Sequence, residues 1–436
     1  MDSLTIGLIG VVAMIVLLAL RVPIAFSLGG VSFVGIIAIR GPNAAYSLIG
    51  GLPFDFASSW ELSAIPMFLL MGAVAYQTGM TSSLFRAARL WLDGLPGGLA
   101  VATNFTAAGF AAASGSSLAT AAAVGRLAIP EMLRFGYSPS LATATVAAAG
   151  TLGALIPPSI AFVLYGWFTE QSVGRLLMAG LVPGLLTAGM YSLMIVGRCM
   201  ADRSLAPRVE ESVSWRERFA VLREIWPLPL LILGVVGSIY AGVATPTEAG
   251  ALGALFACVI GALKGALDRA TLTAAVSESL RTTASVFFLA IGAIFLTRFL
   301  AMAGIPGVIA EVVTDLDLGP LELVLLMSAV YLVLGMFLDP IGVMLLTLPV
   351  LLPAFNALGM DLIWLGVIVV KLIEIGLLTP PVGLNVYVVK GVVGDQVPLG
   401  AIFRGVGWFL ACEFVIMVLL IAFPALSLWL PGLMEG

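Results

Sequence analysis

The residues best suited to binding a ligand lie where long apolar stretches are interrupted. SGSSLAT at 114–120 places several hydroxyls inside an apolar run, while GTLGALIPPS at 150–159 and GLLTPPVG at 376–383 each contain two adjacent prolines. Because proline has no N–H, the carbonyls one turn before the first pair, around Gly153 and Ala154, lose their helical partners. In lipid such a carbonyl is costly unless a cation or a facing segment takes it. Hydroxyl and carbonyl oxygens suit hard cations such as sodium.

Two structural explanations compete with cation binding. The small residues of SGSSLAT could serve close helix packing, and neighbouring hydroxyls could satisfy a simple proline kink. The recurrence of the proline pair opposite FLDP at 337–340 favours the binding explanation. Asp339 in that segment would lie at membrane depth, where ionisable groups are expensive and usually functional.

The composition places the chain in a membrane and limits its chemistry. Of 436 residues, 61% are hydrophobic and only 10% are charged, and the mean hydropathy is +1.14, which indicates a polytopic membrane protein. Histidine is absent, which removes Ser–His catalysis and the HExxH zinc site. The three cysteines are far apart, so a disulfide framework is not expected. Nothing resembles a basic nucleic-acid face, and we expect no organic cofactor.

The apolar runs predict ten crossings and two hairpins. Each run is long enough to cross a bilayer, about 17–25 residues, and they lie near 4–20, 24–39, 62–80, 140–166, 176–197, 227–243, 246–263, 284–302, 362–390 and 405–430. The stretches 98–130 and 320–355 are interrupted by SGSS and DP. We expect re-entrant hairpins there, since irregular backbone at membrane depth must be buried in protein or line a cavity. A broken but spanning helix is the alternative. The N-terminal run is interpreted as a retained first span.

The two halves of the chain repeat each other. An offset of 223 residues aligns four pairs of prolines where chance predicts fewer than one: Pro23 with Pro246, Pro130 with Pro353, Pro157 with Pro380, and Pro158 with Pro381. Each half would hold five crossings plus one hairpin. Since five is odd, the second half must lie upside down relative to the first. Inverted repeats with paired Gly/Pro interruptions are typical of secondary transporters and indicate the binding site.

The basic residues predict the orientation. With the N-terminus outside, sixteen of the twenty Lys and Arg residues fall on the cytoplasmic side, and Arg40, Arg175, Arg298 and Lys371 do not. The acidic loop 303–322 then falls outside, and the polar linker 198–224 inside, as the positive-inside rule requires.

Four charged residues allow structural explanations. Lys371 and Glu374 are three residues apart and could neutralise each other. Arg298 lies near the outer end of its span and could snorkel or contact a substrate carboxylate. Glu248 in ATPTEAG is expected to cap a helix that begins after Pro246.

An ordered set of motifs resembles the large membrane subunit of TRAP (tripartite ATP-independent periplasmic) transporters. The motifs are SGSSLATAAAVGRLAIPEMLRFGY, AAAGTLGALIPPSIAFVLYG, AGLVPGLL, GVATPTEAGALGA and LLTPPVGLNVYVVKG, and they span nearly the whole chain. The resemblance implies an all-α elevator-type transporter in the bacterial inner membrane, and the distribution of basic residues predicts that its N-terminus is periplasmic. It also implies sodium-driven uptake of small carboxylates delivered by a periplasmic binding protein. A separate small four-helix membrane subunit would complete the assembly.

The resemblance also implies domains and sites. The first repeat would occupy 1–197, with scaffold helices in 1–80 and transport elements in 98–166. The cytoplasmic linker would be 198–224, and the second repeat 225–436, with scaffold helices in 227–302 and transport elements in 320–390. The residues expected around two sodium sites are Ser114, Gly115, Ser116, Ser117, Gly150, Thr151, Gly153, Pro157, Gly335, Asp339, Gly376, Thr379 and Pro380. Those expected near the substrate are Ser116, Thr120, Ser159, Asn385, Arg298 and Lys371.

Other functions remain open on the sequence alone. A divalent-anion/sodium symporter could work without a binding protein. An intramembrane enzyme would need a Ser–Lys pair, and Lys371 is the only lysine deep in a span. A passive channel is disfavoured because paired ion sites imply coupling.

Overall fold

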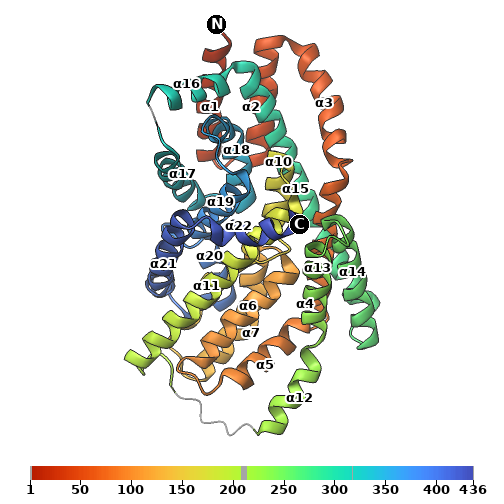
Figure 1. Ribbon diagram of the computed structural model, residues 1–436, viewed down its shortest axis with the longest axis vertical. Helices are drawn as coiled ribbons and strands as arrows, with labels where there is room; N and C mark the ends of the chain where they lie inside the picture. The colour runs from red at the N-terminus through yellow and green to blue at the C-terminus, as the bar shows by residue number, and fades with distance from the viewer. Residues whose placement is uncertain (1, 208–213, 317, 436) are drawn as a thin grey trace.

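The chain is entirely helical in the parts that the structure describes. The computed structural model (Figure 1) describes residues 2–207, 214–316 and 318–435. Within these ranges it contains twenty-two α-helices, three short 3-10 helices and no strand, which confirms the all-α prediction. By length and composition six helical segments could cross a membrane, or up to eight if two bent pairs each count as one span. The shorter apolar helices include α1 and α2.

The first half contains eleven helices. The predicted runs 4–20, 24–39, 62–80 and 176–197 each match one of them, whereas 98–130 covers two helices and 140–166 covers three. The eleven helices are α1 Ser3–Ala19, α2 Ile24–Arg40, α3 Pro42–Ala57, α4 Ala64–Gln77, α5 Met80–Leu92, α6 Gly98–Ser114, α7 Ser117–Arg134, α8 Pro139–Gly150, α9 Leu152–Leu155, α10 Ile160–Thr169 and α11 Val173–Ala201. The predicted break at 114–117 is the turn between α6 and α7. The predicted proline break separates α9 from α10.

The second half also contains eleven helices. They are α12 Trp215–Ile225, α13 Pro227–Tyr240, α14 Pro246–Leu263, α15 Arg269–Ala303, α16 Ile305–Asp315, α17 Pro320–Gly335, α18 Pro340–Ala357, α19 Leu362–Gly376, α20 Leu384–Val393, α21 Leu399–Ala422 and α22 Ala425–Gly432. Thr245 and Glu248 form a capping box at the start of α14. This confirms Glu248 as a helix cap.

The order of helices repeats at the offset found in the sequence. Moved by 223 residues, α7 falls on α18 from its first residue to its last, and α2 falls on α14 to within one residue. Both proline pairs contain a cis peptide bond, at Pro157–Pro158 and at Pro380–Pro381. The two breaks are therefore equivalent in position and in backbone form.

Four helices lie where no span was expected, namely α3, α5, α12 and α16. Two of them, α5 and α12, are amphipathic, and they pack against each other through aromatic rings. Trp91 of α5 makes edge-to-face contacts with Trp215 and Phe219 of α12, and its indole N–H donates to the Arg218 carbonyl at 3.1 Å. Residues 215–224, predicted as part of a polar linker, are thus helical and packed. Residues 208–213 of that linker lie outside the described part.

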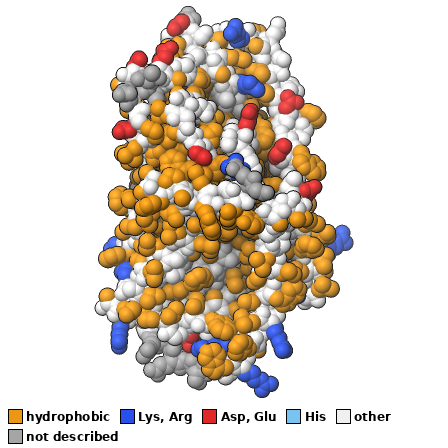
Figure 2. Space-filling model, viewed as in Figure 1, with side chains coloured by type: hydrophobic (Ala, Val, Ile, Leu, Met, Phe, Trp, Pro, Cys, Tyr) orange, Lys and Arg blue, Asp and Glu red, His pale blue; other side chains and the backbone are white. Residues whose placement is uncertain are grey.

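The molecule is elongated, with its polar ends separated by an apolar band. The N-terminus, α16 and the start of α3 lie at the upper end in Figure 1, and α5 and α12 lie at the lower end. In Figure 2 acidic side chains gather in the upper part, and Lys and Arg project around the lower rim while also occurring above. Hydrophobic side chains cover the surface between them, as expected for a protein that faces lipid.

Candidate ion and substrate site

The tip of the hairpin formed by α6 and α7 docks onto the first proline break. Gly115 ends α6 with φ +61°, and a Cβ there would lie 2.7 Å from the Pro158 carbonyl oxygen. The backbone N–H of Ile160 donates to the Gly115 carbonyl at 3.3 Å. Only glycine accommodates both the left-handed conformation and this close approach. This contact brings together two segments that are about forty residues apart along the chain.

Four backbone carbonyls lie one helical turn before the two proline pairs, those of Gly153, Ala154, Gly376 and Leu377. Three of them accept a hydrogen bond from another donor. The Ala154 carbonyl accepts the Ser159 hydroxyl at 2.6 Å. The Gly376 carbonyl accepts the Thr379 N–H at 3.1 Å, and the Leu377 carbonyl accepts the Asn385 N–H at 3.1 Å. The expectation that Ala154 would offer a free carbonyl is thus wrong, because a nearby hydroxyl satisfies it.

Gly153 is the exception. Its carbonyl faces Pro157, which has no N–H to donate, and no described residue supplies another hydrogen bond to it. A Cβ on Gly153 would lie 2.5 Å from the Ser116 carbonyl oxygen, so the hairpin tip is in direct contact with this residue. Among the four carbonyls only that of Gly153 fits the prediction of a free cation ligand.

The hydroxyls of the SGSSLAT motif are used in different ways. Ser114 and Thr120 share a hydrogen bond of 2.8 Å, and Thr120 also donates to the Ser116 carbonyl at 2.8 Å. The Ser116 hydroxyl caps α7 by accepting the Ala119 N–H at 3.5 Å. The Ser117 hydroxyl is buried and has no hydrogen-bond partner among the described residues.

The second hairpin, α17 and α18, repeats this arrangement at the second break. The N–H of Gly383 donates to the Met336 carbonyl at 3.3 Å, and a Cβ on Gly376 would lie 2.7 Å from the Gly335 Cα. Asp339 caps α18 by accepting the Gly342 N–H at 2.9 Å. The Thr379 hydroxyl donates to the Ile375 carbonyl at 2.7 Å.

Asn385, expected near the substrate, lies at the first break although it follows the second in the sequence. Its side-chain N–H donates to the Ala147 carbonyl at 3.2 Å, and its Nδ2 would lie 3.2 Å from a Cβ on Gly150. The residue is fully buried. Because α20 packs against α7 and α8, Asn385 links the two halves rather than completing the second site.

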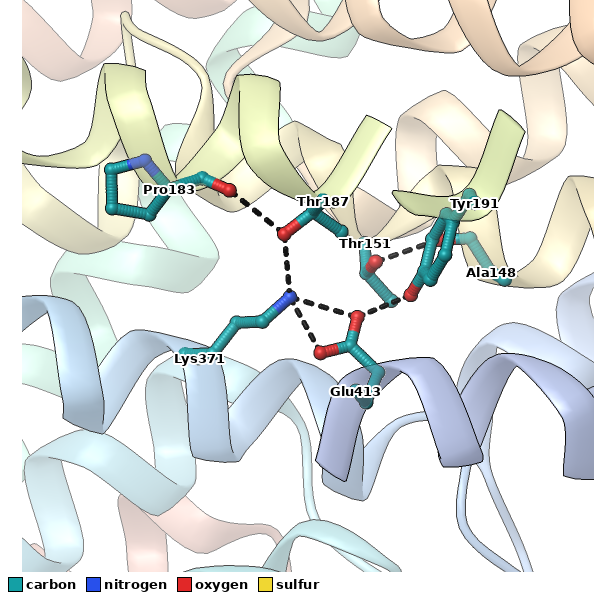
Figure 3. Close-up of polar contacts among 7 residues, drawn as sticks. All are labelled: Ala148, Thr151, Pro183, Thr187, Tyr191, Lys371 and Glu413. Carbon is teal, nitrogen blue, oxygen red and sulfur yellow. Dashed lines mark hydrogen bonds and ion pairs between the residues drawn. The ribbon is translucent and has the colours of Figure 1, made fainter. Parts of the chain in front are cut away.

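Lys371 pairs with a residue that the sequence analysis did not consider. Its Nζ lies 2.6 Å from Glu413 Oε2 and donates to the Thr187 hydroxyl at 3.0 Å, while Tyr191 donates its hydroxyl proton to the same glutamate (Figure 3). The expected neutralisation of Lys371 by Glu374 is therefore wrong, because α21 brings Glu413 closer. The fully buried ammonium lines no described cavity.

A cavity of about 360 Å³ lies between the first hairpin tip and α15. The start of α7 and its N-cap line the cavity with Ser116, Leu118, Ala119, Ala122, Ala123 and Arg126, and all of these except Leu118 share one helical face. Glu278, Ser279 and Thr282 of α15 face them across the cavity. Arg126 was not predicted, although its spacing from Ser116 on a helix beginning there places both on one face.

The second tip faces α15 in the same way. A smaller cavity of about 260 Å³ is lined by Asp339 and Ile341 of the tip, by Ile24 and Ala25 of α2, and by Ser285, Val286 and Leu289 of α15. The helix α15 therefore lines both cavities: residues 278–282 face the first hairpin tip, and residues 285–289 face the second.

Arg298 lies in a separate cavity of about 900 Å³, nearer the other end of α15. Glu61, Glu170 and Thr245 line it as well. The structure does not bring Arg298 together with Ser116, and Ser159, a further expected substrate residue, is fully buried. Of the residues expected near the substrate, Ser116 is the one that lines the cavity at the first tip.

Comparison with known proteins yields one family. Residues 11–426 match the family described as "Tripartite ATP-independent periplasmic transporter, DctM component". The chain is 39% identical over 398 residues to a C4-dicarboxylate TRAP transporter large permease protein of Pseudomonas aeruginosa, covering 91% of this chain and 92% of the relative. It is 31% identical to a sialic acid TRAP transporter large permease protein of Vibrio cholerae, covering 96% and 97%.

A solved transporter has the same fold. The YdaH transporter of Alcanivorax borkumensis superposes with a TM-score of 0.65 at 15% identity, covering 96% of this chain and 98% of that one. At this identity the likeness concerns the fold alone.

Proposed function

The chain belongs to the DctM component family of tripartite ATP-independent periplasmic transporters and is a large membrane subunit of that kind, and from this premise we propose that it couples sodium entry to the import of small organic anions. Its relatives are transporter permeases and not enzymes. The observation that carries the proposal is the contact between each hairpin tip and a proline break, with the Gly153 carbonyl left without a donor.

The first site would hold sodium between the tip and the break. Oxygen is the ligand that hard cations prefer, and Gly153 contributes a carbonyl that costs free energy while it is unpaired. The Ser117 hydroxyl is a second buried oxygen without a partner. At the second site the Asp339 carboxylate faces a cavity and has one oxygen in a helix cap, so the other is available to a cation.

The substrate would bind in the cavity between the first tip and α15. Two relatives are named for C4-dicarboxylates and for sialic acid, and both kinds of molecule carry carboxylates. Arg126 is exposed into this cavity, and a guanidinium binds a carboxylate through two parallel hydrogen bonds. A cavity of about 360 Å³ is within the size range of small-molecule sites.

Transport would proceed by movement of the two hairpins and broken helices relative to α15. The order of helices that repeats after 223 residues suits two inverted repeats, and small cavities at both tips mark the boundary along which the elements would slide. Cation binding at the breaks would fix the tips in place, so that the anion moves only together with sodium. The N-terminus would be periplasmic, in the bacterial inner membrane.

The test is reconstitution in proteoliposomes. The complete system should contain this chain, a small four-helix membrane subunit and a periplasmic binding protein loaded with a C4-dicarboxylate or sialic acid. We expect uptake only when all three proteins and an inward sodium gradient are present. Robust uptake by this chain alone would show a stand-alone symporter, and uptake that merely equilibrates the anion would show a channel.

A further inference from the structure

The large apolar side chains of α12 form one exposed stripe. They recur every three or four residues and so lie on one face of the helix, at Trp215, Phe219, Leu222 and, directly after its last residue, Trp226. Trp91 of α5 contacts two of them, yet Trp215 remains 65% exposed and Phe219 58% exposed. Contact with α5 therefore leaves most of this apolar stripe uncovered.

The apolar stripe continues along α13. Exposed side chains of α13 keep the same spacing after Trp226, at Leu230, Leu233 and Tyr240. Together α12 and α13 are long and apolar enough for one membrane span, with a bend of 48° between them. Since the exposed apolar side of α13 faces lipid, the stripe on α12 lies where that lipid surface ends. Tryptophan is enriched at this boundary between acyl chains and headgroups.

The charges of α12 are sorted by sign around the helix axis. With about 3.6 residues per turn, Arg216 and Arg223 lie about a quarter turn to one side of the apolar stripe. Arg218 lies about a quarter turn to the other side. Glu217 and Glu224 lie about half a turn away, on the opposite face. Positive charge thus borders the stripe, and negative charge is kept away from it.

Both acidic residues of α12 are used inside the protein, whereas two of its arginines have no partner there. Glu217 closes the capping box at the start of the helix, and Glu224 forms an ion pair with Arg86 of α5. Arg216 and Arg223 are exposed, and neither forms a hydrogen bond or an ion pair with any described residue. Their charges are therefore available to an anion outside the protein.

We propose that α12 docks on the membrane surface and selects anionic phospholipids through Arg216 and Arg223. The apolar stripe lies among the upper parts of the acyl chains, and the two arginine side chains extend along it so that their guanidinium groups reach the phosphate layer. A guanidinium binds a phosphate through two parallel hydrogen bonds. The two arginines are two helical turns apart, about 10 Å, so each binds a headgroup of its own.

The arrangement fits a phospholipid better than other occupants. A lipid leaflet presents acyl chains beneath a layer of phosphates, which matches an apolar stripe with positive charge beside it. A soluble phosphate would contact the arginines but leave the stripe in water, at a cost in free energy. A protein partner would have to supply two carboxylates at the spacing of Arg216 and Arg223. The surface lies on neither hairpin tip, and its docking does not depend on sodium coupling.

A reporter beside the two arginines tests the proposal. Ala220 is exposed and lies between Arg216 and Arg223 along α12. Ala220→Cys, in a chain whose three native cysteines have been removed, is labelled with a fluorophore, and the full-length protein is placed in phosphatidylcholine nanodiscs. The nanodiscs contain increasing mole fractions of nitroxide-labelled phosphatidylglycerol or nitroxide-labelled phosphatidylcholine. Each basic residue near an anionic membrane contributes about fivefold in affinity, so we expect half-maximal quenching by phosphatidylglycerol at a mole fraction about tenfold lower or more.

Paired substitutions identify the residues responsible. Arg216→Gln with Arg223→Gln should remove the preference and leave quenching by phosphatidylcholine unchanged, which also shows that α12 still lies on the membrane. Arg203→Gln with Arg269→Gln removes two exposed arginines outside α12 and should leave the preference intact. Equal quenching by the two lipids in the wild type, or a preference that survives the first pair of substitutions, would overturn the proposal. No quenching by either lipid, or its loss when the small membrane subunit is added, would show that the stripe faces water or a protein instead.

Discussion

The ammonium group of Lys371 on α19 lies 2.6 Å from the carboxylate of Glu413 on α21, and both side chains are buried. The pair connects α19, which ends at the second proline break, to α21. A buried ion pair is often no better than a hydrophobic pair of the same volume, but breaking one by removing a single partner is costly.

Lys371→Met should therefore destabilise the protein by about 3–5 kcal/mol, since it leaves buried carboxylates without an ammonium. The free energy of unfolding is measured by denaturant titration in detergent micelles. Lys264→Met, at the exposed end of α14, should change it by less than about 0.5 kcal/mol. Adding Glu413→Leu to Lys371→Met should restore part of the loss. A single variant as stable as the control would mean that the pair does not form.

Gly153→Ala should separate the first hairpin tip from the first break. The new Cβ would lie 2.5 Å from the Ser116 carbonyl oxygen and 2.6 Å from its carbonyl carbon, and overpacking of this kind costs about 1–3 kcal/mol. Gly391→Ala is the control, because a Cβ at Gly391 meets no atom within 4 Å. We expect a higher half-saturating sodium concentration for uptake in the first variant only. Equal sodium dependence in both would remove Gly153 from the ion site.

Arg126 and Glu278 should affect substrate binding with opposite signs, because they line the same cavity with opposite charges. Loss of a charge-assisted hydrogen bond costs about 1.5–3 kcal/mol, so Arg126→Gln should raise KM for an anionic substrate about tenfold or more. Glu278→Gln should lower KM, and Arg203→Gln, on an exposed loop, should leave it unchanged. The check is uptake kinetics at several substrate concentrations. A rise in KM for both cavity variants would indicate general damage to the cavity.

Docking of α12 should weaken in acid. The backbone N–H and the hydroxyl of Ser214 donate to Glu217 and lower the pKa of its carboxyl group. A lowered pKa in the folded state means that this stabilisation is fully present above the pKa of the unfolded chain, about 4.3, and is lost as the pH falls further. The hydrogen-exchange protection factors of residues 215–225, which are corrected for the intrinsic pH dependence of exchange, should fall below about pH 4, and Glu217→Gln should remove that dependence. Unchanged protection across this range would contradict the role of the capping box.

The sequence predicts well the features that depend on residue type at fixed spacing. Proline pairs and glycines determine where helices end, so the turns at 114–117 and 336–339 and both proline breaks are found correctly. The contacts of Lys371 and Asn385 could not be found in this way, because they depend on which helices become neighbours after folding. Glu413 is an isolated acidic residue in an apolar run, and nothing near it in the sequence indicates its partner. The helices α5 and α12 were missed because their stability comes from the aromatic contacts between Trp91, Trp215 and Phe219.

Arg126 could have been found from the sequence. On a helix that begins after Ser116, positions 119, 122, 123 and 126 share the face of that serine. This spacing alone therefore identifies Arg126 as the positively charged residue on the face that contains Ser116.

If the hairpins move as proposed, the cavity between the first hairpin tip and α15 opens in turn to each side of the membrane. The most direct measurement is the labelling of a single cysteine at Ala119, an exposed residue of that cavity, by a membrane-impermeant thiol reagent. It is placed in a chain from which Cys199, Cys258 and Cys412 have been removed, and the reagent is applied from each side in turn. Single cysteines at Asn43, in the first turn of α3, and at Ser204, just after the end of α11, are both exposed and serve as one-sided controls. We predict that Ala119→Cys is labelled from both sides and that sodium and substrate change the ratio of the two rates. Labelling from one side only, at a rate that sodium and substrate do not alter, would contradict a moving site.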